Sequence, residues 1–306
     1  MQYVLGLDGG GTKTELIAAD PDGNELLLLQ GGASNPKAVA FEEAMRHVTG
    51  LLDQVPLDPR DCRGVVMGLA GIYTEAERSR AMSHVADHYA KRCGLRMPVY
   101  LTNDAEIALT AGLGVNEGLV AIAGTGSAVF GFTPSGTHYR AGGWGHILGD
   151  TGSGYDIGLH TLQAVMLSFD GVCPPTAITR LVLDHSGIGS PADLRSIVYE
   201  PHIGKQHIAD YARFAIEAAM HGDPAAAELI RKAAAGLAEL ACAVCGRDEW
   251  FAGTRIAVTG SIFAHSELYC DAFCERLHER LPRLAVVKSQ RKSAYGAALL
   301  ALRKFV

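Results

Sequence analysis

The sequence predicts an α/β fold with a duplicated architecture and two domains. A strand–turn–strand pattern opens the chain, and a similar pattern with another glycine-rich turn returns near residue 118. Around these patterns, apolar runs alternate with amphipathic stretches, which is typical of a mixed sheet with a parallel part. A chain of 306 residues also suits two domains of ordinary size better than one core.

The first residues read as two buried strands joined by a glycine-rich turn. Tyr3 to Leu7 and Thr14 to Ala19 are apolar runs, separated by Asp8-Gly9-Gly10-Gly11-Thr12. Successive glycines remove side chains from the turn, so a polyanion can approach the main-chain N–H groups. A plain hairpin turn is the alternative. Asp8 ends the first strand, where it is well placed to hold Mg²⁺ through the water shell of the ion.

The second pattern makes a plain hairpin less plausible as an explanation of the first. Gly118 to Ala123 and Ala128 to Phe132 are again apolar, and Gly124-Thr125-Gly126-Ser127 lies between them. Each turn leads into a strand, whereas phosphate loops and dinucleotide fingerprints lead into a helix. The pair of turns therefore predicts a different type of site for nucleotide phosphates.

The other expected elements follow in an order that partly repeats. The first half continues with strands at Leu26–Leu29, Arg63–Leu69 and Pro98–Leu101 and helices at Phe41–Leu52, Glu75–Arg92 and Asn103–Gly112. The second half has strands at Thr137–Ala141, Arg255–Thr259 and Leu284–Val287 and helices at Ser153–Phe169, Pro174–Asp184, Ala192–Val198, His207–His221, Ala225–Cys245, Ser266–Arg280 and Ala294–Arg303.

Composition indicates a globular enzyme. Hydrophobic residues make up 48% and charged residues 20%, which argues against disorder. The net charge of −6 and the lack of a Lys/Arg cluster argue against nucleic acid as a partner. The chain enters a strand directly, and its apolar runs are too short to cross a bilayer, so we expect no membrane association and a cytoplasmic location.

The seven cysteines show no framework spacing. Cys242 and Cys245 form a C-x-x-C motif inside an alanine-rich helical run, without a second pair of ligands nearby in the sequence. We expect reduced, structural thiols. A metal or redox site, the alternative, needs partners that the sequence does not supply.

Five motifs occur in order along the chain: Asp8-Gly9-Gly10-Gly11-Thr12, Gly68-Leu69-Ala70-Gly71, Thr102-Asn103-Asp104-Ala105, Gly124-Thr125-Gly126-Ser127 and the run from Gly142 to Asp150, GGWGHILGD. Together they resemble the N-acetylglucosamine kinases, which belong to the BadF/BadG/BcrA/BcrD ATPase group of the actin–hexokinase–heat-shock-ATPase superfamily. The resemblance covers essentially the whole chain. The last motif is the most specific, whereas the first is shared by the superfamily and indicates only ATP.

The resemblance implies a duplicated ribonuclease-H-like fold of the actin/hexokinase type, with two domains and ATP in the cleft between them. The N-terminal domain is expected over residues 1–115 and the C-terminal domain, with helical insertions, over 116–290. The final helix, 291–306, is expected to pack back on the N-terminal domain.

The resemblance also implies an ATP and Mg²⁺ site. Lys13 either reaches a phosphate or is a solvated strand residue. The small residues of the helix around Ala294–Ala298 either allow a close approach to the nucleotide or serve only in helix packing. The residues expected to bind ATP are Gly10, Gly11, Thr12, Lys13, Thr125, Gly126, Gly260 and Ser261, together with Asp8 through Mg²⁺.

Asp104 is implied to be the base that accepts the proton of the sugar 6-hydroxyl. Asp104 and Asp150 each precede a helix in the sequence, so both carboxylates also fit a capping role. Trp144 fits either a wall of the sugar pocket or a core aromatic. The residues expected to bind the sugar are Asn35, Asn103, Asp104, Ser127, Gly143, Trp144, Gly145 and Asp150.

The activity that the resemblance implies is ATP-dependent phosphorylation of the 6-hydroxyl of N-acetylglucosamine. Glucosamine and N-acetylmuramate are alternative substrates, because related enzymes with the same motifs use them. A sugar sensor without activity and a dehydratase-activating ATPase are alternative functions. The latter would carry an iron–sulfur cluster on paired cysteines. Similar enzymes are often dimers, so a homodimer is possible.

Overall fold

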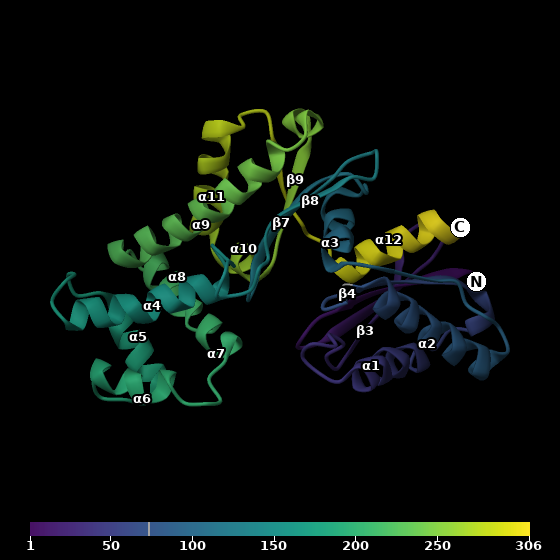
Figure 1. The fold of residues 1–306 in the computed structure, drawn as a ribbon, viewed down its shortest axis with the longest axis horizontal. Coiled ribbons are helices and arrows are strands. Elements are labelled where there is room, and N and C mark those ends of the chain that lie inside the picture. Colours follow the sequence, from purple (N-terminus) through teal and green to yellow (C-terminus); the bar gives the residue numbers. More distant parts are fainter. Residues whose placement is uncertain (73) are drawn as a thin grey trace. The chain divides into compact units, whose positions relative to one another are not determined.

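The computed structural model describes residues 1–72 and 74–306, which form two compact units. The first comprises Met1–Asn116 and Ser289–Val306, and the second comprises Glu117–Lys288 (Figure 1). Each unit contains one five-stranded sheet.

The sheet of the first unit has the strand order β3-β2-β1-β4-β5. Strand β2 pairs antiparallel with both β1 and β3, with Asp8 of β1 opposite Glu15 of β2, whereas β4 and β5 run parallel to β1. The five strands are β1 (Tyr3–Gly9), β2 (Thr14–Ala19), β3 (Glu25–Gly31), β4 (Cys62–Leu69) and β5 (Val99–Thr102).

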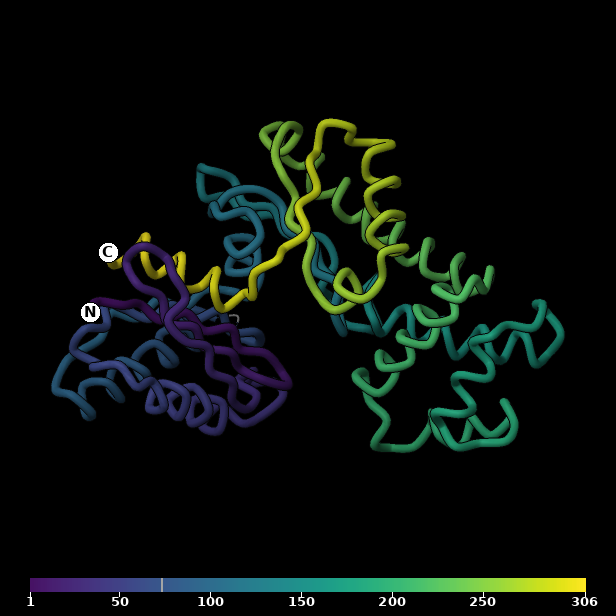
Figure 2. The backbone as a smooth tube through the Cα atoms, turned by 180° about the vertical axis from the view of Figure 1, so that it is seen from behind, coloured from purple at the N-terminus to yellow at the C-terminus, as the bar shows by residue number. Residues whose placement is uncertain are grey.

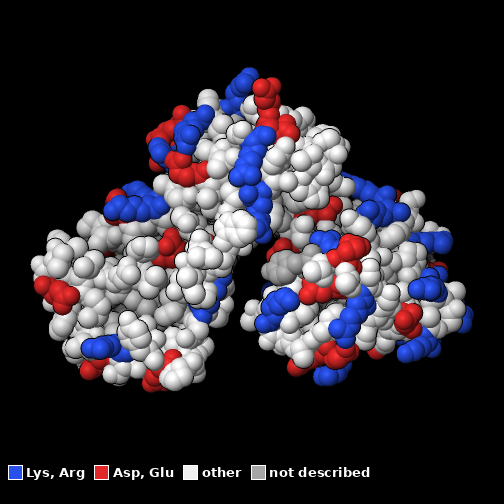
Figure 3. All heavy atoms as spheres, viewed as in Figure 1, with Lys and Arg blue, Asp and Glu red and all other residues white. Residues whose placement is uncertain are grey.

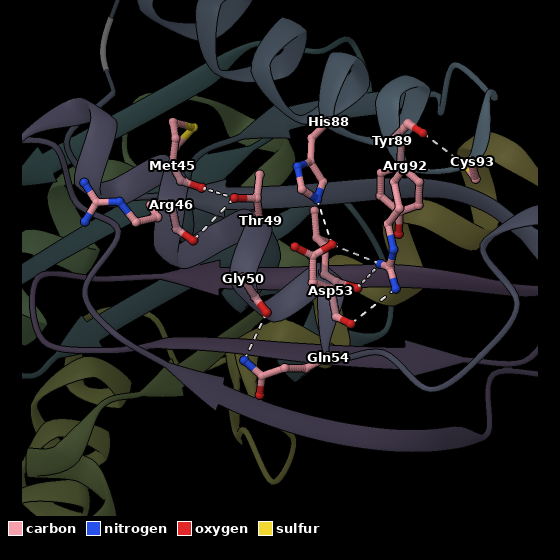
Figure 4. A network of polar contacts seen from close by, with 11 residues as sticks. Met45, Arg46, Thr49, Gly50, Asp53, Gln54, His88, Tyr89, Arg92 and Cys93 are labelled. Atoms are coloured by element: carbon pink, nitrogen blue, oxygen red, sulfur yellow. Dashed lines mark hydrogen bonds and ion pairs between the residues drawn. The ribbon is translucent and has the colours of Figure 1, made fainter.

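Helices α1 (Phe41–Asp53) and α2 (Glu75–Cys93) cover one face of this sheet, over the side chains of Leu5 and Leu7. A polar network joins the ends of the two helices (Figure 4). In it, Asp53 Oδ1 lies 2.8 Å from His88 Nε2 and 3.2 Å from Arg92 Nη1. The buried apolar face and this exposed network together fix α2 beside α1.

Helices α3 (Asp104–Leu113) and α12 (Ser293–Phe305) cover the opposite face, over Val4 and Ile17. Figure 2 shows α12, in yellow, beside the purple strands of the N-terminal segment. The helix crosses β1 at Gly6, where an added Cβ would lie 2.1 Å from the main-chain nitrogen of Ala298. A glycine is therefore required in the middle of β1 for α12 to pack this closely.

The sheet of the second unit repeats the same plan, with the order β10-β9-β6-β7-β8. Here β6 pairs antiparallel with β7 and parallel with β9, just as β1 pairs with β2 and β4. The strands are β6 (Gly118–Ala123), β7 (Ser127–Phe132), β8 (His138–Gly142), β9 (Arg255–Thr259) and β10 (Ala285–Lys288). The duplicated α/β architecture predicted from the two hairpins is confirmed.

The helices of the second unit share one large apolar core with its sheet. Most of its side chains come from long helices, and Leu237 of α9 and Phe273 of α11 are fully buried. The helices are α4 (Gly154–Phe169), α5 (Ala177–Ser186), α6 (Leu194–Val198), α7 (Lys205–Ala209), α8 (Ala212–Met220), α9 (Pro224–Cys245), α10 (Ser261–His265) and α11 (Glu267–Arg280).

One predicted helix in this unit is wrong, and one helix of the unit was not predicted. The single helix expected over His207–His221 is wrong, because the chain forms α7 and α8 with a tight turn between them. In that turn the Tyr211 N–H bonds the Ile208 carbonyl, three residues back rather than four. The sequence also gave no indication of α10, since five residues are too few for a helical period.

Among the described residues, none of the helices is long and apolar enough to span a membrane. On the face drawn in Figure 3, acidic and basic side chains are intermingled, and neither sign covers a whole unit.

The close crossing at Gly6 predicts a specific loss of stability in Gly6→Ala. The added methyl group would overlap the main chain of α12, which should lower the free energy of unfolding by about 1–3 kcal/mol. Urea denaturation measures this difference.

Gly50→Ala is the matched control, because Gly50 lies within α1 and an added Cβ there meets nothing within 4 Å. Its helix should gain about 1 kcal/mol from the better propensity of alanine. A Gly6→Ala protein as stable as the wild type would contradict the packing described for α12.

Candidate active site

The first glycine-rich turn is held in shape by main-chain hydrogen bonds. The Gly10 N–H donates to the Lys13 carbonyl at 3.0 Å. The Gly10 carbonyl in turn accepts the N–H groups of Ser34 and Asn35, at 3.0 and 3.1 Å. The loop after β3 therefore supports the turn and brings Asn35 next to it.

Only one of the three glycines in this turn is required by the packing of the chain itself. A Cβ on Gly9 would lie 2.1 Å from the hydroxyl of Ser34. A Cβ on Gly10 or Gly11 would come no closer than 3.6 Å to another atom, and neither residue has a positive φ. Their lack of a side chain leaves the main chain of an exposed turn open to a ligand.

Lys13 follows the turn and pairs with a carboxylate of its own unit. Its ammonium group and that of Lys292, at the start of α12, both lie 2.9 Å from Oε1 of Glu15. Glu15 is buried, whereas both lysines are about half exposed. Glu15 therefore holds two ammonium groups beside the turn. A contact between Lys13 and a phosphate stays a prediction.

Asp8 and Asp104 are two carboxylates within electrostatic reach of each other in the first unit. Burial, followed by the negative charges of Asp104 and Glu15, raises the pKa of Asp8 to about 7. Burial also raises the pKa of Asp104, although the N–H of Ala105 opposes the rise. Such raised values are typical of functional carboxylates.

Asp104 is not the cap of α3. The capping oxygen is Oδ1 of Asn103, which accepts the Glu106 N–H at 2.8 Å, and Asp104 is the first residue of the helix. Since the parallel strand β5 ends at Thr102, directly before this pair, Asp104 lies at the carboxyl edge of the sheet. Ligands of open α/β sheets bind at that edge.

Asp8 fits the expected contact with Mg²⁺ through water. It is the last residue but one of β1 and lies opposite Gly68 of β4, over which the side chain of Ile107 packs. The three interacting carboxylates of Asp8, Glu15 and Asp104 favour a cation nearby. Within residues 1–72 and 74–306, no three or more His, Cys, Asp or Glu side chains are arranged to hold a metal ion directly.

The second turn lies at the start of α4. The Gly124 carbonyl accepts the Gly154 N–H at 2.7 Å, and the Thr125 carbonyl accepts the Tyr155 N–H at 3.3 Å. Gly124 repeats the situation of Gly10 and Gly11, because an added Cβ there meets nothing within 4 Å and its φ is not positive. This turn is thus equally open to a ligand.

Asp150 lies directly behind the second turn. It is 3% exposed, and its carboxylate accepts the Ser127 N–H at 3.3 Å and the Lys205 ammonium at 2.6 Å. It is not the cap of α4, because the hydroxyl of Ser153 accepts the Asp156 N–H there. Ser127 is also buried and donates its hydroxyl to the Thr151 carbonyl at 2.7 Å, which ties the turn to the Asp150 segment.

The loop between β8 and α4 exposes Trp144. This side chain is 62% exposed, with the Arg140 guanidinium 4.0 Å from the ring centroid, so the core-aromatic alternative is wrong. Gly143 and Gly145 flank it with φ values of 69° and 85°, which L side chains rarely adopt. The loop can therefore present an exposed aromatic surface next to Asp150.

Asn35, in the first unit, is held by a close approach of the chain. Its Oδ1 accepts the Lys37 N–H at 2.8 Å, and a Cβ on Gly71 would lie 2.0 Å from this oxygen. Gly71 also has a φ of 81°. The Gly-Leu-Ala-Gly motif thus gives the Asn35 side chain room beside the first turn.

Gly260 and Ser261 begin the short helix α10 rather than a simple turn. A Cβ on Gly260 would lie 2.2 Å from the Ala123 carbonyl, so the start of α10 packs against the end of β6, just before the second turn. Ser261 lines a pocket of about 420 Å³ together with Ile262, His265 and side chains of α8 such as Arg213. A pocket next to a phosphate-type turn fits an adenosine group, which remains a prediction.

Burial decides between the alternatives left open for the last helix and for the C-x-x-C motif. Ala294, Ala297 and Ala298 are fully buried against β1 and α3, which supports the packing alternative for these residues. Cys242 and Cys245 are both buried in α9, and burial raises the pKa of each thiol. Buried thiols are poor ligands for a cluster shared between subunits.

Three polar residues at the site were missed by sequence reasoning: Glu15, Lys205 and Gln206. Lys205 is 55 residues from Asp150 along the chain, and Gln206 is 81 residues from Thr125. Pairings over such separations leave no local pattern. For Glu15 a signal was present, because a carboxylate inside the otherwise apolar run of β2 is expected to be buried and therefore needs a partner.

The profile of the BadF/BadG/BcrA/BcrD ATPase family matches residues 5–301. The chain belongs to this family. The resemblance seen in the five motifs is therefore confirmed.

Named relatives extend the match. A Clostridium acetobutylicum protein named N-acetylmuramic acid/N-acetylglucosamine kinase is 32% identical over 309 residues, which cover 98% of each chain. An N-acetyl-D-glucosamine kinase of Dictyostelium discoideum is 30% identical over 319 residues, again 98% of each chain. A crystal structure from Chromobacterium violaceum, of a protein provisionally assigned as an N-acetylglucosamine kinase, matches with a TM-score of 0.75 and 26% identity over 99% of each chain. The expected fold class is confirmed by this match.

The raised pKa of Asp8 predicts a pH-dependent stability of the protein without ligands. The unfolded chain releases this proton near pH 4 and the folded chain near pH 7, so ionisation of Asp8 costs stability as the pH rises between them. Relative to Asp8→Asn, the wild type should lose about 2 kcal/mol of unfolding free energy between pH 5 and pH 8.

Urea denaturation at both pH values, with ATP and Mg²⁺ absent, measures this difference. Asp87→Asn, which changes an exposed carboxylate on α2, should follow the wild type at both pH values. If Asp8→Asn also followed the wild type, the electrostatic account of this carboxylate would be wrong.

Proposed function

We propose that this chain is an ATP-dependent amino-sugar kinase that phosphorylates the 6-hydroxyl of N-acetylglucosamine. The observation that carries the proposal is the position of Asp104. Its carboxylate lies at the carboxyl edge of a parallel sheet, interacts with Asp8 beside the first glycine-rich turn, and is not used as a helix cap. The names of the full-length relatives support the class of substrate.

Asp104 would act as the general base of the reaction. As the 6-hydroxyl oxygen bonds to the γ-phosphorus of ATP, the hydroxyl proton passes to the Asp104 carboxylate. The bond from the γ-phosphorus to the β–γ bridging oxygen breaks, and ADP leaves with that electron pair. The raised pKa of Asp104 strengthens the carboxylate as a base.

The two turns would bind the phosphates of ATP through main-chain N–H groups. Gly10, Gly11 and Thr12 would act from the first unit, and Thr125 and Gly126 from the second. Lys13 would add a positive charge once phosphate competes with Glu15 for its ammonium group. Asp8 would hold Mg²⁺ through water, and that ion would supply the charge that neutralises the phosphates during transfer. Ser261, in the pocket that begins at α10, would contact the adenosine.

The sugar would be bound by hydrogen bonds and by one aromatic contact. Asp150 and the amide of Asn35 would hydrogen-bond its hydroxyl groups, and such paired bonds discriminate strongly between sugars. Trp144 would cover an apolar face of the ring or the acetyl group. The remaining contacts assigned to the sugar come from Asn103, Ser127, Gly143 and Gly145.

N-acetylmuramate is the second candidate substrate. The Clostridium acetobutylicum relative carries this sugar in its name and is similar over 98% of the chain. The two sugars differ by a lactyl carboxylate, so the choice between them depends on the charge around the pocket.

A panel of sugars tests the proposal. ADP release, coupled to a spectroscopic assay, is measured with N-acetylglucosamine, glucosamine and N-acetylmuramate. The wild type should turn over N-acetylglucosamine, and Asp104→Asn should lower kcat by about 10²–10⁴ because the base is lost.

Two controls accompany the panel. Binding of N-acetylglucosamine to Asp104→Asn, followed by calorimetry, should persist, which separates a catalytic defect from a folding defect. Exposed Asp87→Asn should keep the wild-type kcat. No turnover of any of the three sugars, or an Asp104→Asn protein with normal kcat, would refute the proposal.

A further inference from the structure

Lys205, on the short helix α7, lies next to both the second turn and Asp150. The Lys205 ammonium donates to Asp150 Oδ2 at 2.6 Å, and the Lys205 side chain is 31% exposed. A Cβ placed on Gly126 would lie 2.8 Å from the same ammonium nitrogen. That Cβ would also lie 3.2 Å from each carboxylate oxygen of Asp150. Turn, carboxylate and ammonium therefore form one compact group.

The helix that carries Lys205 is fixed in place by its packing. Gly158 of α4 faces α7 so closely that a Cβ on it would lie 2.0 Å from the Ile208 carbonyl. The next residue of α7, Gln206, accepts the Thr125 hydroxyl through Oε1 at 2.9 Å. Two consecutive residues of α7 thus contact the segment that carries the second turn and Asp150.

Asp150 needs such a partner for two reasons. It has a φ of 60° and is the one residue other than glycine with a positive φ among those that the structure describes. That conformation persists in a residue other than glycine only where the surroundings impose it. In addition, a carboxylate that is 3% exposed needs charge compensation, which Lys205 supplies.

We propose that Lys205 is a positioning residue for sugar binding, which acts through Asp150. It neutralises the buried carboxylate and holds Oδ2, while the Ser127 N–H holds Oδ1, so that the remaining lone pairs are available to sugar hydroxyls in a fixed direction. This inference rests on the proposed function, in which Asp150 binds the sugar. Preorganisation of this kind lowers the cost of ordering a binding group and therefore affects the KM for the sugar more than the KM for ATP.

Lys205→Met tests this role, because it removes the charge and keeps the length of the side chain. The KM for N-acetylglucosamine should rise at least about tenfold, the effect of losing one charged hydrogen bond. The KM for ATP should stay within about twofold. Lys205→Arg should recover most of the affinity. Lys232→Met, which breaks an exposed ion pair with Glu228 on α9, is the control and should match the wild type.

A double-mutant cycle with Asp150→Asn shows whether Lys205 acts through Asp150. In the Asp150→Asn protein, Lys205→Met should raise the sugar KM no further. Thermal melting is followed for every variant, and Lys205→Gln replaces Lys205→Met if the latter does not fold.

The possible failures are distinguishable. An unchanged sugar KM in Lys205→Met, or an equal effect in both backgrounds, overturns the inference. A rise in the ATP KM alone also overturns it, in favour of a direct phosphate contact. If Asp150→Asn leaves the sugar KM unchanged, or the wild type turns over none of the sugars, the proposed function itself fails.

Discussion

Main-chain amides can hold a polyphosphate only where no side chain keeps it away, and this requirement explains much of the structure. Gly10, Gly11 and Gly124 lie in turns where a Cβ would meet no close neighbour and where φ is not positive. Other glycines have clear internal reasons, such as the crossing of α12 over Gly6. At Gly10, Gly11 and Gly124, where neither a close contact nor a positive φ requires glycine, the missing side chains leave the main-chain N–H groups of the turns open to a ligand.

The same two turns organise the charged groups of each unit. In the first unit, Asp8 ends the strand before the turn, and its raised pKa reflects the nearby charges of Asp104 and Glu15. In the second unit, Asp150 lies behind the turn and forms an ion pair with Lys205. One unit thus gathers excess negative charge that favours a cation, whereas the other balances its buried carboxylate with a lysine.

Sequence reasoning succeeded where the physical signal was local. The hairpin strands and their turns follow from apolar runs broken by glycine, and the repeated hairpin gave the duplicated sheet. It failed where tertiary packing determines the structure. Helices α7 and α8 were expected as one helix, because the close packing of Ile208 against Gly158 cannot be read from periodicity. Capping of α3 by Asn103 rather than Asp104 also depends on one residue of helix register, which sequence patterns rarely resolve. Lys205 could not be found, since its partner is distant in sequence.

The most direct test of the account is the affinity of Gly124→Ala for a non-hydrolysable ATP analogue, measured by calorimetry with Mg²⁺ present. Because an added Cβ at this position meets nothing within 4 Å, the variant should fold with the stability of the wild type. Its affinity for the analogue should fall at least about tenfold, since the new methyl group keeps phosphate from the main chain. An affinity equal to that of the wild type would contradict the assignment of this turn to the phosphates.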